Sequence, residues 1–365
     1  MSAQISALNL NPAVSTAATW RRRSLAIVLM VVIAGIFWID SRYPALLKRY
    51  HAGTQVKAAG SLTFGQVYSV DRSMPLSARV WRTTVNWLDA NRVGMTFSFL
   101  FGPAALTFLA TLRRRRTNSR YFNTLLGVVA GVPLGVCTNC VAPIARGLLA
   151  SGMSSESVLA TMFASPALNV VVLAMTFALF PMSVALLKLA TVFFLIFVFA
   201  PLVTSRVQPE SESNVIACPI EVPVSETWMQ TFAGIARSYA RSFWYVFRIA
   251  LPLMLLAAVL GALVVEALPQ QALFAPVTVV GILAVALVGA FLPVPMAFDV
   301  AIAYIAMAKG VPLPYVVTIL CTLGIISVYS LSIVGKSISW RVAAAAYATV
   351  AALGTVAGLI ARTLA

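Results

Sequence analysis

The sequence predicts an all-α polytopic membrane protein of eight to nine spans, built from two related halves with broken or re-entrant helices. Hydrophobic residues make up 61% of the chain and charged residues 10%, and the mean hydropathy is +0.93. Soluble domains carry about 25% charged residues, so this composition excludes an ordinary soluble fold. Basic clusters beside apolar runs indicate the topology, and helix breakers inside other apolar runs indicate the two halves.

The basic residues lie where membrane topology requires them. The net charge is +16, and Arg21–Arg23 and Arg113–Arg116 each adjoin an apolar run. Lys and Arg next to spans favour the cytoplasmic side and contact with anionic lipid, which argues against a nucleic-acid partner. We therefore expect a multi-pass protein of the bacterial inner membrane with a cytoplasmic N-terminus.

The chain is expected to begin with a tail and a first span. Residues 1–23 are small, polar and finally basic, which is typical of a cytoplasmic tail. Ser24–Ile39 follows as an apolar run, and without a convincing small-residue cleavage site we interpret it as a retained span rather than a signal peptide.

A segment of mixed polarity separates the two N-terminal spans, which together occupy 24–112. This segment, 41–92, is expected on the extracytoplasmic side, since long loops translocate largely regardless of charge. Trp81 and Trp87 suit either an interfacial amphipathic helix or a small packed cap. Val93–Leu112 is the second expected span.

Two halves follow, 113–203 and 246–365. The residues between them, 204–245, are rich in Pro and Glu and then become amphipathic, which predicts a linker and a helix at the membrane surface. The apolar runs of the two halves are Tyr121–Val136, Ser157–Phe180, Val184–Val203, Ile249–Ala267, Ala275–Leu292, Met296–Ala308, Pro314–Val334 and Val342–Leu359.

The halves show a weak internal repeat. A shift of 158 residues places Gly152 on Gly310 and Asn169 on Ser327, with breaks near Cys137 and at Pro293–Pro295 in corresponding positions. Repeats with interrupted helices are typical of transporters. Helices that cross would make the halves parallel, whereas re-entrant hairpins would make them inverted; the positive charge of the linker region favours the inverted arrangement.

The break after Val136 contains a possible dithiol site. Cys137 and Cys140 are separated by Thr138 and Asn139, and positions i and i+3 of a helix place both sulfurs on one side. Thiolates bind soft ions such as Cu(I) or trivalent arsenic, so both cysteines are candidate soft-ion ligands. The alternative is two cysteines that pack as small hydrophobic residues.

Polar residues elsewhere in the apolar runs extend this candidate site. Ser165 and Asn169 in the first half, and Ser327 in the second, are expected to line the same cavity or to form hydrogen bonds between packed helices. Asp299 is an acidic residue inside an apolar run, which predicts either a coupling site for protons or cations or a helix cap.

Other features of the sequence narrow the function. Arg146 and Lys309 are expected to extend toward the membrane surface. No Walker loop or dinucleotide loop is present, and a single histidine, His51, excludes a multi-histidine metal or haem site, so we expect no cofactor. Cys218 and Cys321 are expected to be structural.

The motif around the dithiol resembles the predicted-permease family that includes ArsP and YraQ. The resemblance covers about 130–172 well, through Pro-Leu-x-x-Cys-x-x-Cys-x-x-Pro followed by Ser165-Pro166-Ala-Leu-Asn169, and 290–330 loosely. It implies an ion-driven efflux permease for trivalent organoarsenicals, with Cys137, Cys140, Pro143, Pro166 and Asn169 at the family's motif positions. The spacing of the cysteines and the absence of a cysteine near Asp299 depart from the family pattern.

These observations predict a permease, not an enzyme, that moves a small thiophilic or polar solute, with Asp299 as the coupling residue. Two other hypotheses are a membrane thiol-disulfide oxidoreductase using Cys137 and Cys140, and a non-transporting membrane subunit. The substrate, the direction of transport, the coupling ion and the oligomeric state stay open.

Overall fold

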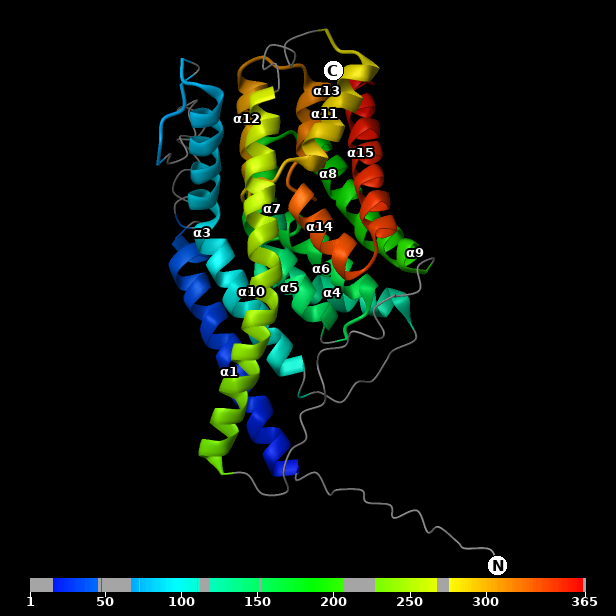
Figure 1. Cartoon of the computed structure of the whole chain (residues 1–365). Coiled ribbons are helices and arrows are strands. Elements are labelled where there is room, and N and C mark those ends of the chain that lie inside the picture. Colours follow the sequence, from blue (N-terminus) through cyan, green and yellow to red (C-terminus); the bar gives the residue numbers. More distant parts are fainter. Residues whose placement is uncertain are drawn as a thin grey trace, which may run out of the picture.

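The computed structural model describes residues 16–44, 47, 67–71, 73–109, 111, 119–150, 152–205, 227–267 and 276–363. Within these ranges all regular elements are helices, which confirms the predicted all-α class (Figure 1). The predictions that concern residues 1–15, His51, Arg113–Arg116, Cys218 and the linker residues 206–226 lie outside the described residues.

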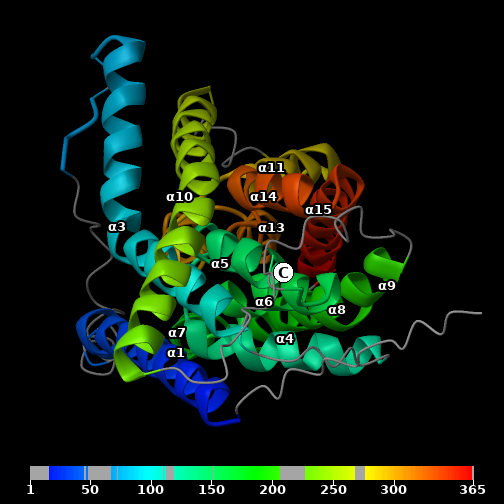
Figure 2. The same ribbon diagram turned by 60° about the horizontal axis from the view of Figure 1, so that its bottom comes forward.

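Long helices form the frame of the molecule. They are α1 (Thr16–Phe37, continued by the π-helical turn η1, Trp38–Arg42), α3 (Leu76–Leu109), α8 with η2 and α9 (Met182–Phe194, Leu195–Phe199 and Ala200–Ser205), α10 (Trp228–Ala267) and α15 (Trp340–Thr363). Seen from the end where α1 and α10 begin, α1, α3 and α10 group on one side and α8, α9 and α15 on the other (Figure 2).

Shorter helices fill the space between these groups. They are α4 (Arg120–Leu134), α5 (Thr138–Ala150), α6 (Ser155–Ala167), α7 (Val170–Leu179), α11 (Val279–Phe291), α12 (Phe298–Ala308), α13 (Leu313–Thr322) and α14 (Val328–Ser337). In Figure 1, α4, α5 and α6 lie toward one end of the molecule, and α11, α12 and α13 toward the opposite end.

Several helices are suited to cross a bilayer. By length and composition these are Trp20–Ser41, Met182–Ser205, Trp228–Leu263 and Trp340–Thr363, and the bent pair α6 and α7 adds a fifth candidate. A bilayer core requires about 20 apolar residues in one helix. The single long helices therefore account for fewer than the predicted eight to nine spans. Many of the apolar runs are instead divided into shorter helices.

The predicted breaks occur where the sequence places helix breakers. Helix α4 is followed by Gly135, whose φ of 53° is left-handed, and residues 292–297, which include Pro293 and Pro295, separate α11 from α12. Gly152 and Gly310 also have positive φ, at 88° and 83°, as expected for turns that favour glycine.

Two of the predicted apolar runs are each divided between two helices. Ser157–Phe180 is divided between α6 and α7, which meet at 47°, and Pro314–Val334 is divided between α13 and α14. Asn169 and Ser327 end each break as helix N-caps, accepting hydrogen bonds from the backbone N–H groups that begin α7 and α14.

Three other helices are longer than predicted. The tail predicted to end at Arg23 is helical from Thr16, and α3 begins at Leu76 rather than at Val93. The surface helix expected before Ile249 is continuous with the following span in α10. No proline or glycine interrupts 235–251, so nothing in that sequence stops the helix.

Helices α4 and α6 pack in close contact through two glycines. A Cβ atom added at Gly127 would overlap the Ser157 carbonyl oxygen, and one at Gly131 would lie 2.8 Å from the Thr161 carbonyl oxygen. The Thr161 hydroxyl donates to the Gly127 carbonyl at 3.0 Å, which holds the two backbones together. Small residues therefore allow α6 to lie directly against α4.

Replacing Gly127 with alanine should destabilise the fold, because the added methyl group separates α4 from α6. Overpacking of this kind costs about 1–3 kcal/mol, and the midpoint of thermal unfolding of the protein in detergent should fall accordingly. Gly35→Ala is the control, since no other atom lies within 4 Å of its added Cβ. Equal midpoints for the two variants would contradict the close packing.

Candidate functional site

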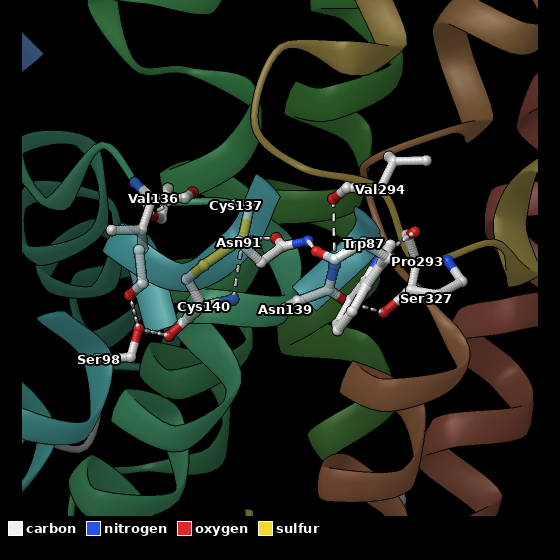
Figure 3. Close-up of a disulfide and its surroundings, with 12 residues drawn as sticks. Trp87, Asn91, Ser98, Val136, Cys137, Asn139, Cys140, Pro293, Val294 and Ser327 are labelled. Atoms are coloured by element: carbon white, nitrogen blue, oxygen red, sulfur yellow. Dashed lines mark hydrogen bonds between the residues drawn. A yellow bond between two sulfur atoms is a disulfide. The ribbon is translucent and has the colours of Figure 1, made fainter. Parts of the chain in front are cut away.

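Three helix breaks meet at the start of α5. The Asn139 side-chain amide donates to the Val294 carbonyl at 3.1 Å, and its oxygen accepts from the Ser327 hydroxyl at 2.7 Å. The Thr138 hydroxyl donates to the Ile325 carbonyl at 3.1 Å. Thr138, Asn139 and Ser327 are fully or almost fully buried, so the first break is tied to both breaks of the second half inside the protein (Figure 3).

The two cysteines of the motif lie beside this junction, joined as a disulfide (Figure 3). Their Cα atoms are 5.1 Å apart, and the two residues are 3% and 2% exposed. The Cys140 backbone N–H donates to the Cys137 sulfur at 3.1 Å. A disulfide does not bind a soft ion, because the ligand is the thiolate. Ligation by this pair therefore requires its reduction.

One face of α3, which the sequence interpretation did not assign to the site, covers the cysteines. The Asn91 side-chain oxygen lies 3.6 Å from the Cys137 sulfur, and Gly94 leaves room for the Cys140 sulfur, which an added Cβ would approach to 2.7 Å. Ser98 donates to the Cys140 carbonyl. One turn before Asn91, the Trp87 indole N–H donates to the Pro293 carbonyl at 2.7 Å.

This placement changes the interpretation of 41–92. Trp81 is 66% exposed, as expected for a surface tryptophan, but Trp87 and Asn91 contact the helix breaks. Asn91 occurs four residues after Trp87 and shares its helix face, a spacing that could have identified both. The predicted boundary at Val93 hides this face, because α3 is one helix from Leu76 to Leu109.

Ser165, on α6, holds the backbone of the first break. Its hydroxyl accepts from the Val136 N–H and lies within hydrogen-bonding distance of the Val136 carbonyl, at 3.2 Å each. The Asn169 amide donates to the carbonyls of Ser165 and Pro166 at 2.9 and 3.0 Å. These polar atoms are engaged by backbone groups, so in this structure both residues shape the breaks.

The two prolines at the family's motif positions lie inside helices. Pro143 is a buried residue of α5, and Pro166 occurs in α6 just before its bend. A proline in a helix removes one backbone N–H, which releases the carbonyl one turn earlier. The structure brings Cys137, Thr138, Asn139, Cys140 and Ser327 into one cluster. Pro143 and Pro166 lie further along α5 and α6, and Asn169 caps α7.

Asp299 forms a buried ion pair that the sequence interpretation missed. Its carboxylate lies 2.5 Å from the Lys188 ammonium of α8, and the two side chains are 9% and 4% exposed. The N-cap of α12 is Ala297, which makes no side-chain cap, so Asp299 is not the predicted helix cap. A lone lysine within the apolar run Val184–Val203 was the signal that could have identified Lys188.

The break between α13 and α14 connects the ion pair to the cysteine cluster. Gly324 has a φ of 80°, and a Cβ at this position would lie 3.2 Å from the Cβ of Asp299. The next residue, Ile325, accepts the hydrogen bond from Thr138. Movement of this break would therefore affect the ion pair and the start of α5 together.

The part of the chain that the structure describes holds no group of three or more His, Cys, Asp and Glu side chains able to bind a metal ion. A soft ion at the candidate site would have two sulfur ligands from Cys137 and Cys140, and any others would come from the solute or its surroundings.

Comparison with known proteins identifies relatives among membrane permeases. The family model described as predicted permease, ArsP_1, matches residues 104–363. The protein YraQ of Escherichia coli (strain K12) is 24% identical over 244 residues, which is 65% of this chain and 65% of YraQ. The chain thus matches less than two thirds of the length of that relative. No solved structure matches this chain significantly.

The hydrogen bonds of Asn139 should be energetically coupled to Ser327. Asn139→Ala and Ser327→Ala each leave a buried polar group without its partner, which costs about 1–3 kcal/mol, and the double variant should lose less than the sum. Thermal unfolding of the single and double variants measures this difference. Ser332→Ala is the control, since its hydroxyl donates to Val328 of the same helix. Additive losses would contradict a direct contact.

The oxidation state of the cysteines can be measured by counting thiols. Of the four cysteines in the chain, Cys137 and Cys140 should resist a maleimide when the protein is denatured without reductant. After reduction both should react, which adds two labels to the intact mass. Reaction of all four before reduction would show that the isolated protein holds the pair as a dithiol.

Proposed function

The chain belongs to the predicted permease family, and we propose that it moves a small, thiophilic solute such as a trivalent organoarsenical across the bacterial inner membrane by ion-coupled alternating access. The junction of helix breaks at Asn139 carries the proposal. Broken backbone within apolar surroundings is tolerated where protein or a cavity encloses it, and in transporters it marks the substrate site. Cys140, next in the chain, places a sulfur at the same junction.

Helix boundaries support two related halves. Helices α7 and α14 have 10 residues each, and both of their ends are offset by the 158 residues of the sequence repeat. The same offset relates Met182–Ser205 to Trp340–Thr363, each 24 residues long, and the end of α3 to the end of α10. Related halves of this kind underlie alternating access in many transporters.

The positions of the short helices support an inverted relation between the halves. Helices α4 and α5 lie toward one end of the molecule and their counterparts α11 and α12 toward the other (Figure 1). Two re-entrant hairpins that enter from opposite sides account for this arrangement. The bent pairs α6–α7 and α13–α14 then cross beside them, together with the long helices.

Basic residues support a cytoplasmic position for the end where α1 begins. The Arg21 guanidinium lies 5.1 Å from the centroid of the Trp228 ring at the start of α10, and Arg23 donates to the Thr111 carbonyl just beyond α3. These contacts gather basic helix ends on one side. Lys and Arg concentrate on the cytoplasmic side of inner-membrane proteins, which favours an internal N-terminus.

The reduced cysteine pair has the chemistry for a thiophilic solute. Two thiols exchange with the two hydroxyl groups of a monosubstituted arsenous acid, forming two As–S bonds and releasing two water molecules. In the reduced, unliganded site the Cys137 thiol donates a hydrogen bond to the Asn91 side-chain oxygen. Release on the other side reverses the exchange, so no net oxidation occurs during transport.

The Lys188–Asp299 pair supplies a mechanism for ion coupling. Protonation of Asp299 neutralises the carboxylate and leaves the Lys188 ammonium buried without a counter-ion, a state that costs several kcal/mol. The protein relieves this cost by separating α8 from α12 or by exposing Lys188. Because the Gly324 break contacts Asp299, the movement reaches the substrate junction.

The Cys137–Cys140 disulfide also favours a second candidate function, a membrane thiol-disulfide oxidoreductase. Exposure of 3% or less at both cysteines argues for a small substrate rather than a protein partner at this site. Cycling of the disulfide with transport absent would support this candidate. A non-transporting subunit, by contrast, would tolerate replacement of Asp299.

Everted membrane vesicles that contain the full chain should accumulate a trivalent methylarsenical when a proton gradient is imposed. Cys137→Ser with Cys140→Ser should reduce uptake at least about tenfold, because both As–S bonds are lost. Asp299→Asn should abolish accumulation but retain exchange of labelled for unlabelled solute. Lys309→Met is the control, because Lys309 is exposed after α12.

Each result has a separate consequence. Vesicles of the native protein that accumulate no arsenical would remove the substrate assignment. Gradient-driven accumulation in Asp299→Asn would remove the coupling role of the ion pair while leaving the thiol site intact.

A further inference from the structure

Arg146 lies in a polar cluster between α5, α10 and α14, away from the cysteines. One guanidinium nitrogen donates to the Ser337 hydroxyl at 2.9 Å and another to the Tyr245 hydroxyl at 3.0 Å. The guanidinium carbon also lies 4.9 Å from the centroid of the Tyr245 ring. Arg146 is thus held between helices by side-chain contacts.

Two hydrogen-bond donors of this cluster are unused. The Arg146 Nε atom and the Tyr329 hydroxyl are both buried without a hydrogen-bond partner, and Tyr329 is 0% exposed. Arg146 is within electrostatic range of that hydroxyl. Among the described residues, no carboxylate forms an ion pair with Arg146. The cluster therefore presents a positive charge and two free donors.

This combination is unfavourable unless a ligand completes it. Hydroxyl groups and an aromatic ring orient a guanidinium but do not neutralise it, and a donor atom that is buried without an acceptor is costly. By contrast, Arg79 and the buried Lys188 each pair with a carboxylate, Glu266 and Asp299 respectively. An anion with at least two oxygens would supply both the charge and the acceptors.

We propose that Arg146, Tyr245, Tyr329 and Ser337 form a binding site for an oxyanion, of the phosphate or carboxylate class, between α5, α10 and α14. Arg146 carries the charge, and the ring of Tyr245 and the hydroxyl of Ser337 fix its orientation. Tyr329 donates a second hydrogen bond. Arginine is suited to this task because its planar guanidinium donates to oxyanions from several nitrogens.

The anion has two possible sources, a free small oxyanion or the phosphate of an anionic lipid headgroup. The test uses the full chain, purified in a neutral detergent. Equilibrium binding of radiolabelled inorganic phosphate tests the first source. Retention of phosphatidylglycerol over phosphatidylcholine, measured by native mass spectrometry, tests the second. Neither measurement requires a gradient or a thiophilic solute.

Tyr329→Phe is the decisive variant, because the hydroxyl that it removes has no partner in the protein. Without a ligand, the variant should therefore fold and unfold like the native chain. Loss of a hydrogen bond to an anion should weaken binding about tenfold or more. Arg146→Gln should abolish binding, and Arg146→Lys should retain part of it. Tyr347→Phe is the control, since that hydroxyl donates to the Leu287 carbonyl at 3.0 Å.

The outcomes are distinct. Saturable phosphate binding that Tyr329→Phe weakens identifies a free oxyanion, and selective lipid retention with the same sensitivity identifies a headgroup. If the native chain binds neither probe, or if Tyr329→Phe and Arg146→Gln bind as well as the native chain, the proposal is overturned. Cys137→Ser with Cys140→Ser should keep the anion site, so failure of the transport proposal leaves this result unaffected.

Discussion

Polar groups at helix breaks in an apolar interior must find hydrogen-bond partners, and in this protein the side chain of Asn139 binds polar groups of two breaks at once. Its amide binds the Val294 carbonyl and the Ser327 hydroxyl, which belong to separate breaks of the second half. Water is scarce at this depth, so the positions of the three breaks depend on one another. The disulfide, the covering face of α3 and the α13–α14 break are all arranged around this contact.

The charged side chains inside the protein also depend on specific partners. The buried Lys188–Asp299 pair joins α8 to α12, and its two residues are 111 positions apart in the sequence. Each partner makes the other tolerable in apolar surroundings, and loss of either charge would leave the other unpaired. Arg146 differs, because its protein partners are neutral. An ion pair that protonation can break is suited to the proposed ion coupling, whereas a guanidinium without a carboxylate partner is suited to binding an anion.

The family, the helix breaks and the Cys137–Cys140 pair all support a membrane permease. The thiol pair is buried at the junction of the breaks, where a conformational change that opens either side would also change its exposure. Reduction of the disulfide is then a condition for binding a soft ligand. In the proposed mechanism, transport of such a solute therefore depends on the redox state of the same two sulfurs.

Composition and motif determined the helical membrane class, the family and the central position of Cys137–Cys140, because hydropathy and a short break motif are local properties of sequence. Only the tertiary structure decided that Lys188 pairs with Asp299 and that Trp87 and Asn91 face the breaks. These contacts join residues far apart in the chain. Hydropathy shows where a polar residue is costly, but the partner that compensates it is set by how the helices pack.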